Sequence, residues 1–223
     1  MLVFVYLALH RDRKVGREEL IEAVWPEQTR PRAADSALSS LLSKLRQVLG
    51  PDALPGRGEA RLVLPGEAWI DLEAAAAALH RAQSAVALED WTAAWAPARI
   101  ALHTAHRGFL PGEDAPWIEE QRRELEGLRL SALECAAEVG LGLGGPELAA
   151  TERSGRRLIE LEPYRESGYR FLMEALERRD NVAEALRVYE RLRVTLREEL
   201  GVPPGVGAQA LHKRLLDRGS ARS

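Results

Sequence analysis

Apolar residues recur at helical spacing through residues 158–201 and predict a pair of packed helices there. The first series is Gly168, Phe171, Leu172, Ala175 and Leu176, and the second is Ala185, Tyr189, Leu192, Leu196 and Leu200. Asn181, with Glu184 three residues later, is typical of a helix N-cap, and Gly201 is typical of a helix end. The short turn at 177–180 predicts an antiparallel helical hairpin of the kind that stacks in helical repeat proteins.

The same helical spacing is found upstream of this hairpin. It predicts helices at residues 71–87, from Trp91 onward with Asp90 as the N-cap, and from residue 117 to about 139. The glycine-rich run 141–145 predicts a flexible break before the next helix. Paired helices of this kind form an array that resembles tetratricopeptide repeats, whose concave surfaces bind other proteins.

The first part of the chain predicts three helices followed by a β-hairpin. The helices are expected at residues 1–9, 17–25 and 33–49. The third should bury one face, formed by Leu38, Leu41, Leu42, Leu45, Val48 and Leu49. Gly/Pro turns around the extended runs 61–64 and 69–71 predict the two strands of the hairpin.

This order of elements resembles a winged helix of the response-regulator type. The matching residues are Glu18-Glu19-Leu20-Ile21 with Val24-Trp25, and Leu38, Ser43, Lys44, Leu45, Arg46, Leu49 and Gly50. In that family the third helix lies in the DNA major groove and the hairpin touches the flanking backbone. Members usually begin with a small antiparallel sheet, whereas this chain begins inside the first helix. The resemblance therefore implies an incomplete winged helix that lacks its N-terminal sheet.

The resemblance makes the exposed face of the third helix the candidate DNA contact. With the leucines inward, that face presents Ser36, Ser39, Ser40, Ser43, Lys44 and Gln47, with Arg46 near its boundary. Nearby arginines that could contact phosphate are Arg30, Arg32, Arg57 and Arg61. Serine and glutamine side chains hydrogen-bond phosphates or base edges. The alternative is a serine-rich helix face, with arginines around it, that contacts only solvent.

A second resemblance rests on an ordered set of residues that runs from 161 to about 216. The set comprises Leu161-Glu162-Pro163 with Arg165-Glu166, Leu172-Met173, Ala175-Leu176, Ala183-Glu184-Ala185-Leu186, Tyr189-Glu190-Arg191-Leu192, and Glu198-Glu199-Leu200-Gly201-Val202 with Pro204. These residues are similar to the bacterial transcriptional activation domain of the Streptomyces antibiotic regulatory protein family. In that family the domain usually follows a winged-helix DNA-binding domain. The resemblance implies that the helical part self-associates or contacts RNA polymerase.

Charge alone does not suggest a nucleic-acid binder. The net charge is −3, but residues 1–66 hold 10 Lys/Arg against 8 Asp/Glu, while residues 67–223 hold 21 against 26. The front part is therefore slightly basic and the remainder is acidic. A net charge of +2 on the front part is a weak electrostatic footprint for DNA binding.

The sequence offers no convincing catalytic, cofactor or metal site. Its histidines are dispersed, and only His103 and His106 share a helix face, without a cysteine partner, so a solvated or capping role is favoured over zinc binding. The run 140–145 lacks the Lys-Ser/Thr pair of a phosphate-binding loop. The single cysteine, Cys135, lies among alanines and is expected to be a small buried side chain. We expect a protein that is not an enzyme and needs no cofactor or metal.

The apolar opening of the chain does not predict a membrane segment. It is shorter than the roughly 20 residues that span a bilayer. Its positive charges follow the apolar run, whereas a secretory signal carries them before it. We therefore expect a soluble, cytoplasmic protein that makes no membrane contact.

Together these patterns predict a mainly α protein in two domains. An incomplete winged helix is expected at residues 1–68 and a helical-repeat activation domain at 69–217, followed by a tail at 218–223. The predicted function is transcription regulation, with the third helix on double-stranded DNA and the helical domain contacting RNA polymerase or a second copy. The alternative is a protein-interaction module that has lost DNA binding and acts through partner proteins. A small-molecule sensor that uses the helical concavity is a third hypothesis.

Overall fold

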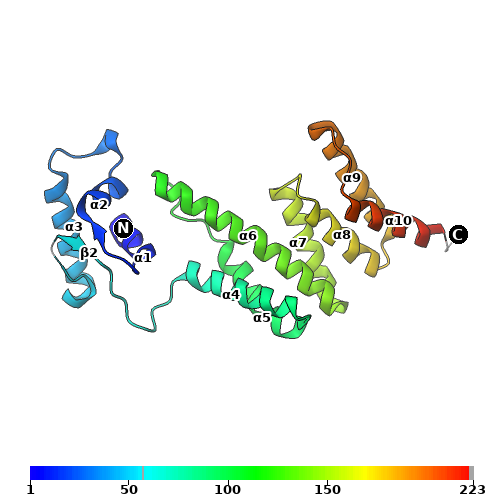
Figure 1. The fold of residues 1–223 in the computed structure, drawn as a ribbon, viewed down its shortest axis with the longest axis horizontal. Coiled ribbons are helices and arrows are strands. Elements are labelled where there is room, and N and C mark those ends of the chain that lie inside the picture. The colour runs from blue at the N-terminus through cyan, green and yellow to red at the C-terminus, as the bar shows by residue number, and fades with distance from the viewer. Residues whose placement is uncertain (57, 221–223) are drawn as a thin grey trace. The chain divides into compact units, whose positions relative to one another are not determined.

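The computed structural model describes residues 1–56 and 58–220 and is mainly α-helical, as the sequence predicts (Figure 1). The chain divides into two compact units. The N-terminal unit comprises residues 1–69 and 109–122, and the helical unit comprises residues 70–108 and the chain from 123 onward.

The N-terminal unit is built on three helices that match the expected positions. They are α1 (Leu2–Leu9), α2 (Arg17–Val24) and α3 (Ala34–Leu49), with 3₁₀ turns η1 (Glu27–Thr29) and η2 (Pro51–Ala53) after α2 and α3. Leu7, Leu20 and Leu38 are fully buried, one from each helix, and form the centre of the unit's core. Burial of such leucines supplies the main driving force that holds the three helices together.

The sheet of this unit differs from the expected hairpin. Strands β1 (Val15–Gly16) and β2 (Glu59–Ala60) pair antiparallel, with Val15 opposite Ala60. The runs 61–64 and 69–71 do not pair with each other among the described residues. Leu62 is instead buried in the core, and Asp71 begins helix α4. The prediction of the hairpin strands was therefore wrong, because Leu62 and Leu64 of the first run pack in the core and the second run leads into a helix.

Two residues expected on the buried face of α3 are exposed. Val48 is 81% exposed and Leu49 is 37% exposed. Val48 lies ten residues after Leu38, which places it about 80° around the helix from that residue at 3.6 residues per turn. The buried face of α3 is therefore narrower than the leucine pattern predicts, and it ends before the last turn.

Residues 109–122 belong to the N-terminal unit although they follow two helices of the other unit. Helix α6 (Pro116–Leu143) begins in this segment. The Trp117 indole N–H donates to the carbonyl of Ala23 at 2.9 Å, and its ring meets the Tyr6 ring edge-on at 5.2 Å between centroids. Ile118 is fully buried. Trp117 and Ile118 therefore fix the start of α6 to the packed helices of the N-terminal unit.

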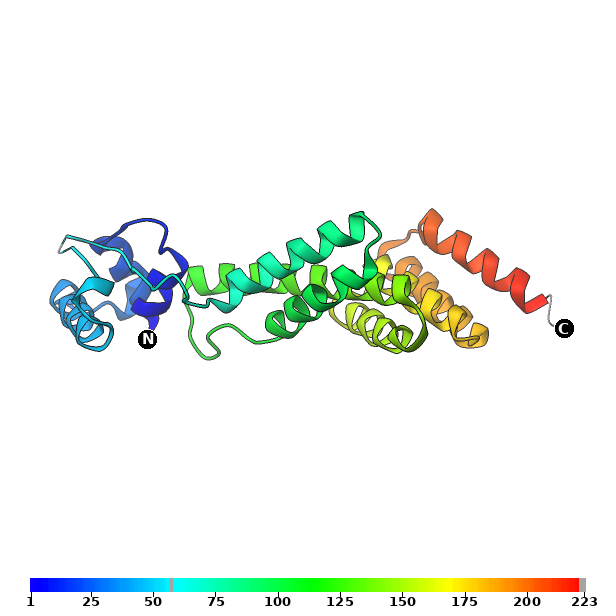
Figure 2. The ribbon, with the colours of Figure 1, turned by 90° about the horizontal axis from the view of Figure 1, so that it is seen from below.

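The helical unit is an array of successive helices (Figures 1 and 2). They are α4 (Asp71–Ala87), α5 (Trp91–Ala105), the greater part of α6, α7 (Leu148–Leu161), α8 (Glu166–Arg178), α9 (Val182–Leu200) and α10 (Val206–Ser220), with a 3₁₀ turn η3 (Gly145–Glu147) before α7. Helix α4 packs on α5, α7 on α8, and α8 on α9, while α10 contacts both α8 and α9.

The predicted caps of this unit are confirmed. The Asp90 side chain accepts from the Ala93 N–H at 2.9 Å, and the Asn181 side chain accepts from the Glu184 N–H at 3.4 Å. Gly201 ends α9 in the left-handed conformation with a φ of 70°. Cys135 is buried, as expected, and burial raises the pKa of its thiol to about 11.

The glycine-rich run is helical over most of its length, so the prediction of a flexible break at 141–145 was too broad. Helix α6 continues to Leu143, and the chain turns only afterwards, where Gly144 has a φ of 68°. A Cβ on Gly142 would lie 2.1 Å from the Trp91 ring. The glycine therefore allows a close approach between side chain and helix, a role that its sequence pattern does not reveal.

Candidate nucleic-acid interface

One face of α3 is a continuous polar stripe. Ser36, Ser40, Ser43 and Gln47 stand at i, i+4, i+7 and i+11, and all four are exposed. The opposite face carries Leu38 and Leu42, which are buried against α1 and α2. The structure thus brings these four predicted residues together on the solvent side of a helix whose other side is fixed by the core.

The edge of this stripe is organised by a residue that the sequence analysis missed. The Arg17 guanidinium, at the start of α2, donates to the Asp35 carboxylate at 2.8 Å and to the Ser39 hydroxyl at 2.7 Å. Ser39 also donates to the carbonyl of Asp35 at 2.9 Å. Ser39 is exposed but its hydroxyl is already engaged on both sides. Arg17 is separated from Asp35 by 18 positions, so no local sequence pattern predicts this contact.

Lys44 and Arg46 are in different situations although both are basic residues in the C-terminal half of α3. Lys44 is exposed and has no ion-pair partner among the described residues. Arg46 is half-buried and donates to the carbonyls of Leu54 at 3.0 Å and Gly56 at 2.7 Å. Arg46 therefore holds the segment that follows α3, and Lys44 is the cation that remains available on the helix.

The other candidate arginines lie outside α3. The Arg30 guanidinium is 4.0 Å from the Glu22 carboxylate, and Arg32 is exposed without a partner in the described part of the chain. Arg61 donates to the carbonyl of Arg11 at 3.2 Å. Arg57 lies outside the described residues. Among the described arginines of this set, Arg32 is thus the one whose guanidinium has no partner within the described residues.

A hydrogen-bonded cluster in the same unit fixes α1 against α2. The Tyr6 hydroxyl donates to Glu19 at 2.7 Å, and the Arg13 guanidinium donates to both oxygens of the same carboxylate. Arg13, and after it Tyr6, lower the pKa of Glu19 to about 2. Burial, together with the Glu19 carboxylate, raises the pKa of Tyr6 to about 12. Because Glu19 stays ionised and Tyr6 stays protonated around neutral pH, the cluster keeps a fixed charge state.

This surface can hydrogen-bond a polyanion but carries no catalytic constellation. Exposed hydroxyls and an amide on one helix face can contact phosphate oxygens or base edges, and the free Lys44 and Arg32 can neutralise phosphates. Within residues 1–56 and 58–220, no cluster of three or more His, Cys, Asp or Glu side chains could hold a metal ion. In the same ranges no helix is both long and apolar enough to span a membrane.

This chain is similar to bacterial regulatory proteins. The model of the family described as "Bacterial transcriptional activator domain" matches residues 70–216. The regulatory protein AfsR of Streptomyces coelicolor is 34% identical over 94% of this chain and 21% of that protein. The transcriptional regulatory protein EmbR of Mycobacterium tuberculosis is 28% identical over 96% of this chain and 56% of that protein. The chain therefore spans about a fifth of AfsR and little more than half of EmbR.

A solved structure shows the same fold over nearly the whole chain. The structure of Mycobacterium tuberculosis EmbR in complex with a low-affinity phosphopeptide superposes with a TM-score of 0.81 and 27% sequence identity. The match covers 97% of this chain and 58% of that one. The similarity therefore extends across both the N-terminal unit and the helical unit.

Proposed function

Because the chain belongs to the bacterial transcriptional activator domain family and is similar to regulatory proteins, we propose that it regulates transcription by docking α3 on double-stranded DNA. The observation that supports this role is the exposed polar stripe on α3, beside an unpaired lysine and opposite the buried Leu38 and Leu42. A helix presented in this way fits the width of the DNA major groove.

The chemistry of the stripe assigns a role to each kind of side chain. Gln47 carries an amide, which can donate to and accept from the edge of adenine, while serine hydroxyls bond either bases or phosphates. Lys44 and Arg32 would contact phosphates and contribute affinity that depends on salt. Arg46 acts indirectly, because it shapes the segment after α3 through the carbonyls of Leu54 and Gly56.

The helical unit would supply the protein contacts of the regulator. Stacked helix pairs expose an extended surface that binds other proteins. We expect this surface to contact RNA polymerase or a second copy of the chain, in line with the activator role that the family description states. In this arrangement the N-terminal unit selects the DNA and the helical unit recruits the partner.

A second candidate function is a protein-interaction module without DNA binding. It is favoured by the small number of free cations around α3, since Arg46 and Arg61 are bonded to backbone carbonyls of the N-terminal unit. The net charge of residues 1–66 is only +2, from 10 Lys/Arg and 8 Asp/Glu. A protein of this kind would regulate through partner proteins alone.

DNA binding by a matched pair of variants separates the two functions. Fluorescence anisotropy of the full chain would be measured against fluorescein-labelled genomic DNA fragments at two salt concentrations. We expect Lys44→Ala with Gln47→Ala to weaken binding roughly tenfold and to reduce the salt slope by about 1, because one phosphate contact is lost. The control is Lys213→Ala with Gln83→Ala, which removes the same two residue types from exposed positions of the helical unit.

The outcome decides between the two functions directly. Equal binding by wild type and both double variants would contradict docking through α3. A folded chain that binds no DNA at low salt would contradict the DNA-binding function and favour the interaction module. Arg46 is not replaced in this test, because losing its backbone hydrogen bonds would disturb the fold as well as the charge.

A further inference from the structure

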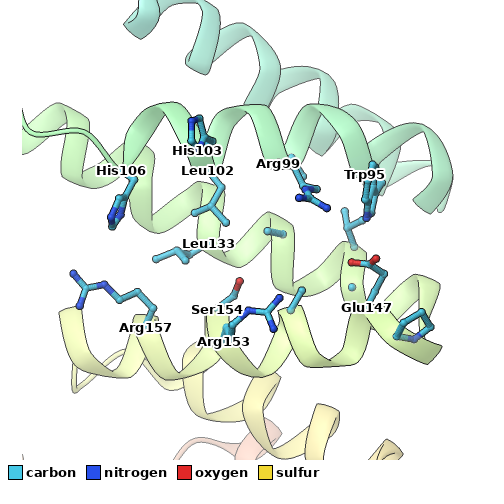
Figure 3. A pocket seen from close by; sticks show the side chains of 16 residues that line it. Trp95, Arg99, Leu102, His103, His106, Leu133, Glu147, Arg153, Ser154 and Arg157 are labelled. Atoms are coloured by element: carbon cyan, nitrogen blue, oxygen red, sulfur yellow. The ribbon is translucent and has the colours of Figure 1, made fainter.

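The helical unit contains a groove between α5 and α7 whose floor is formed by α6. Its volume is about 530 Å³, and every residue that lines it belongs to the helical unit. Figure 3 shows the two flanking helices with side chains from both reaching into the space between them. A hollow of this size lies within the range of functional ligand sites, about 300–1,000 Å³.

The floor of the groove is apolar. Leu133 and Val139 of α6 are buried there, and Leu102 of α5 is half-buried beside them. In Figure 3, Leu102 and Leu133 extend toward each other across the middle of the groove. An apolar side chain that packed over Leu102 on this floor would lose its water contact, which stabilises binding in proportion to the area covered.

The rim of the groove is basic, and two of its charges are free. Arg99 extends from α5 toward α7, and Arg153 extends from α7 toward α5 (Figure 3). Neither guanidinium has a carboxylate or carbonyl partner in the part of the chain that the structure describes. Arg99 instead lies over the Trp95 ring at 4.7 Å from its centroid. The third arginine, Arg157, pairs with Glu160 at 2.8 Å.

The lining of the groove is basic, whereas the helical part of the chain as a whole is acidic. Three arginines and one glutamate, Glu147, line the groove, whereas residues 67–223 as a whole carry 26 Asp/Glu against 21 Lys/Arg. Several other arginines of the array have carboxylate partners, such as Arg165 with Glu134 at 2.8 Å. An acidic unit that leaves a local pair of arginines unpaired across an apolar floor favours an occupant with negative charge.

The groove is long enough for a peptide. From Trp95 to His106 its α5 side covers about 16 Å at 1.5 Å per residue. A second hollow of about 360 Å³ adjoins it and shares Trp95, Pro146 and Glu147 with it. At about 3.3 Å per residue, the first hollow alone accommodates roughly five residues of extended chain. The continuation past Trp95 fits an elongated occupant better than a compact small molecule.

We propose that this groove binds an acidic peptide segment of a partner protein. Carboxylates of the segment pair with Arg99 and Arg153 on opposite rims, and one apolar side chain packs over Leu102 and Leu133 on the floor. Guanidinium and carboxylate groups form charge-assisted hydrogen bonds that fix orientation as well as charge. The site is separate from the α3 surface and does not require DNA binding. It specifies the chemistry of a partner that the helical unit can recruit.

The test uses the full chain and three fluorescein-labelled peptides with blocked ends. Each peptide has two acidic residues on either side of one central apolar residue. That central residue is Leu in the first peptide, Phe in the second and Trp in the third. We expect saturable binding of at least one peptide by fluorescence anisotropy. Replacing its carboxylates by amides, or its central residue by Ser, should weaken binding roughly tenfold or more, because a charged contact or the buried apolar area is lost.

Matched variants assign the binding to the groove. Arg99→Gln with Arg153→Gln should weaken binding of the acidic peptide roughly tenfold, while Arg81→Gln with Arg191→Gln should change it less than about twofold. Arg81 and Arg191 are exposed arginines of α4 and α9 that do not line the groove. Equal losses in the two variants, tight binding of the amide peptide, or no binding by any of the three peptides would overturn the proposal.

Three further arms identify other occupants and separate this site from α3. Saturable binding of glutarate or inorganic phosphate without peptide binding would indicate a small-anion site and overturn the peptide assignment. Displacement of bound peptide by duplex DNA, together with loss of DNA binding in the Arg99 and Arg153 variant, would assign the groove to nucleic acid instead. The Lys44→Ala, Gln47→Ala variant should keep full peptide affinity, so the α3 proposal and this one fail independently.

Discussion

The N-terminal unit joins its elements through side chains that reach across long stretches of sequence, whereas the first two helices of the helical unit pack through small residues at close range. In the former, Trp117 bonds the carbonyl of Ala23, and Arg61 bonds the carbonyl of Arg11. In the latter, the interface of α4 and α5 is built on fully buried alanines, among them Ala78, Ala82, Ala94, Ala98 and Ala101. Small residues let helix backbones approach, so the α4–α5 pair depends on local spacing, while the N-terminal unit depends on a few distant contacts.

Replacing Trp117 is expected to have the largest effect, because it removes one of these distant contacts. Trp117→Ala should lower the free energy of unfolding of the N-terminal unit by about 3 kcal/mol, through lost aromatic packing and an unpaired carbonyl at Ala23. Hydrogen exchange should show faster opening of α1 and α2 and little change in α8 and α9. The matched control is Trp69→Ala, since Trp69 is 70% exposed. If the two variants behaved alike, the start of α6 would not stabilise the N-terminal unit.

Replacing a glycine by alanine should lower the free energy of unfolding where two helices approach closely and raise it where the glycine faces open space. A Cβ on Gly168 of α8 would lie 2.8 Å from the Leu158 Cβ and 3.2 Å from the Gly155 carbonyl oxygen, both in α7. Gly168→Ala should therefore separate α7 from α8 and lower the free energy of unfolding by about 2 kcal/mol. A Cβ on Gly127, in α6, meets nothing within 4 Å. Gly127→Ala should stabilise by about 0.5–1 kcal/mol through helix propensity.

Thermal unfolding of the two alanine variants provides the measurement. The melting temperature should fall for Gly168→Ala and rise slightly for Gly127→Ala. A shift of the same sign in both would show that close helix approach does not limit the stability of the array.

These two units also differ in how much of them the sequence could predict. Helices of the array follow from periodicity alone, and their caps at Asp90 and Asn181 follow from residue types at fixed offsets. The strand pair of the N-terminal unit could not be predicted, because β1 and β2 have two residues each and show no alternation. The return of residues 109–122 to this unit is likewise a long-range event that no local pattern encodes.

The α3 stripe and the groove between α5 and α7 also differ in how much of them the sequence could predict. The exposed stripe from Ser36 to Gln47 was predictable, because placing leucines inward fixes what faces outward. The engagement of Arg46 was not, since its carbonyl partners are set by how the chain folds after η2. Arg99 and Arg153 are 54 positions apart and read as ordinary solvated charges in the sequence. Only the packing of α5, α6 and α7 brings them to one groove.

The stability of the N-terminal unit should also depend on acid pH, since the Glu19 carboxylate links α2 to Tyr6 and Arg13. Its folded pKa of about 2 lies below the ordinary value of about 4.3. A depressed carboxyl pKa adds stability that is present above about pH 4.3 and is lost as the pH falls toward 2. The N-terminal unit should therefore lose stability across this window.

Glu19→Gln should remove that part of the pH dependence and leave the unit less stable at pH 7. Urea titrations at pH 7, 4, 3 and 2, followed by the methyl NMR signals of Leu7 and Leu20, measure the effect where the cluster acts. The control is Glu18→Gln, which alters the neighbouring exposed carboxylate. If the wild-type chain and both variants lost stability with the same slope below pH 4.3, the Glu19 cluster would contribute nothing to the pH dependence of stability. A slope reduced in Glu19→Gln alone would show that one distant hydrogen-bonded contact gives the N-terminal unit an acid sensitivity specific to it.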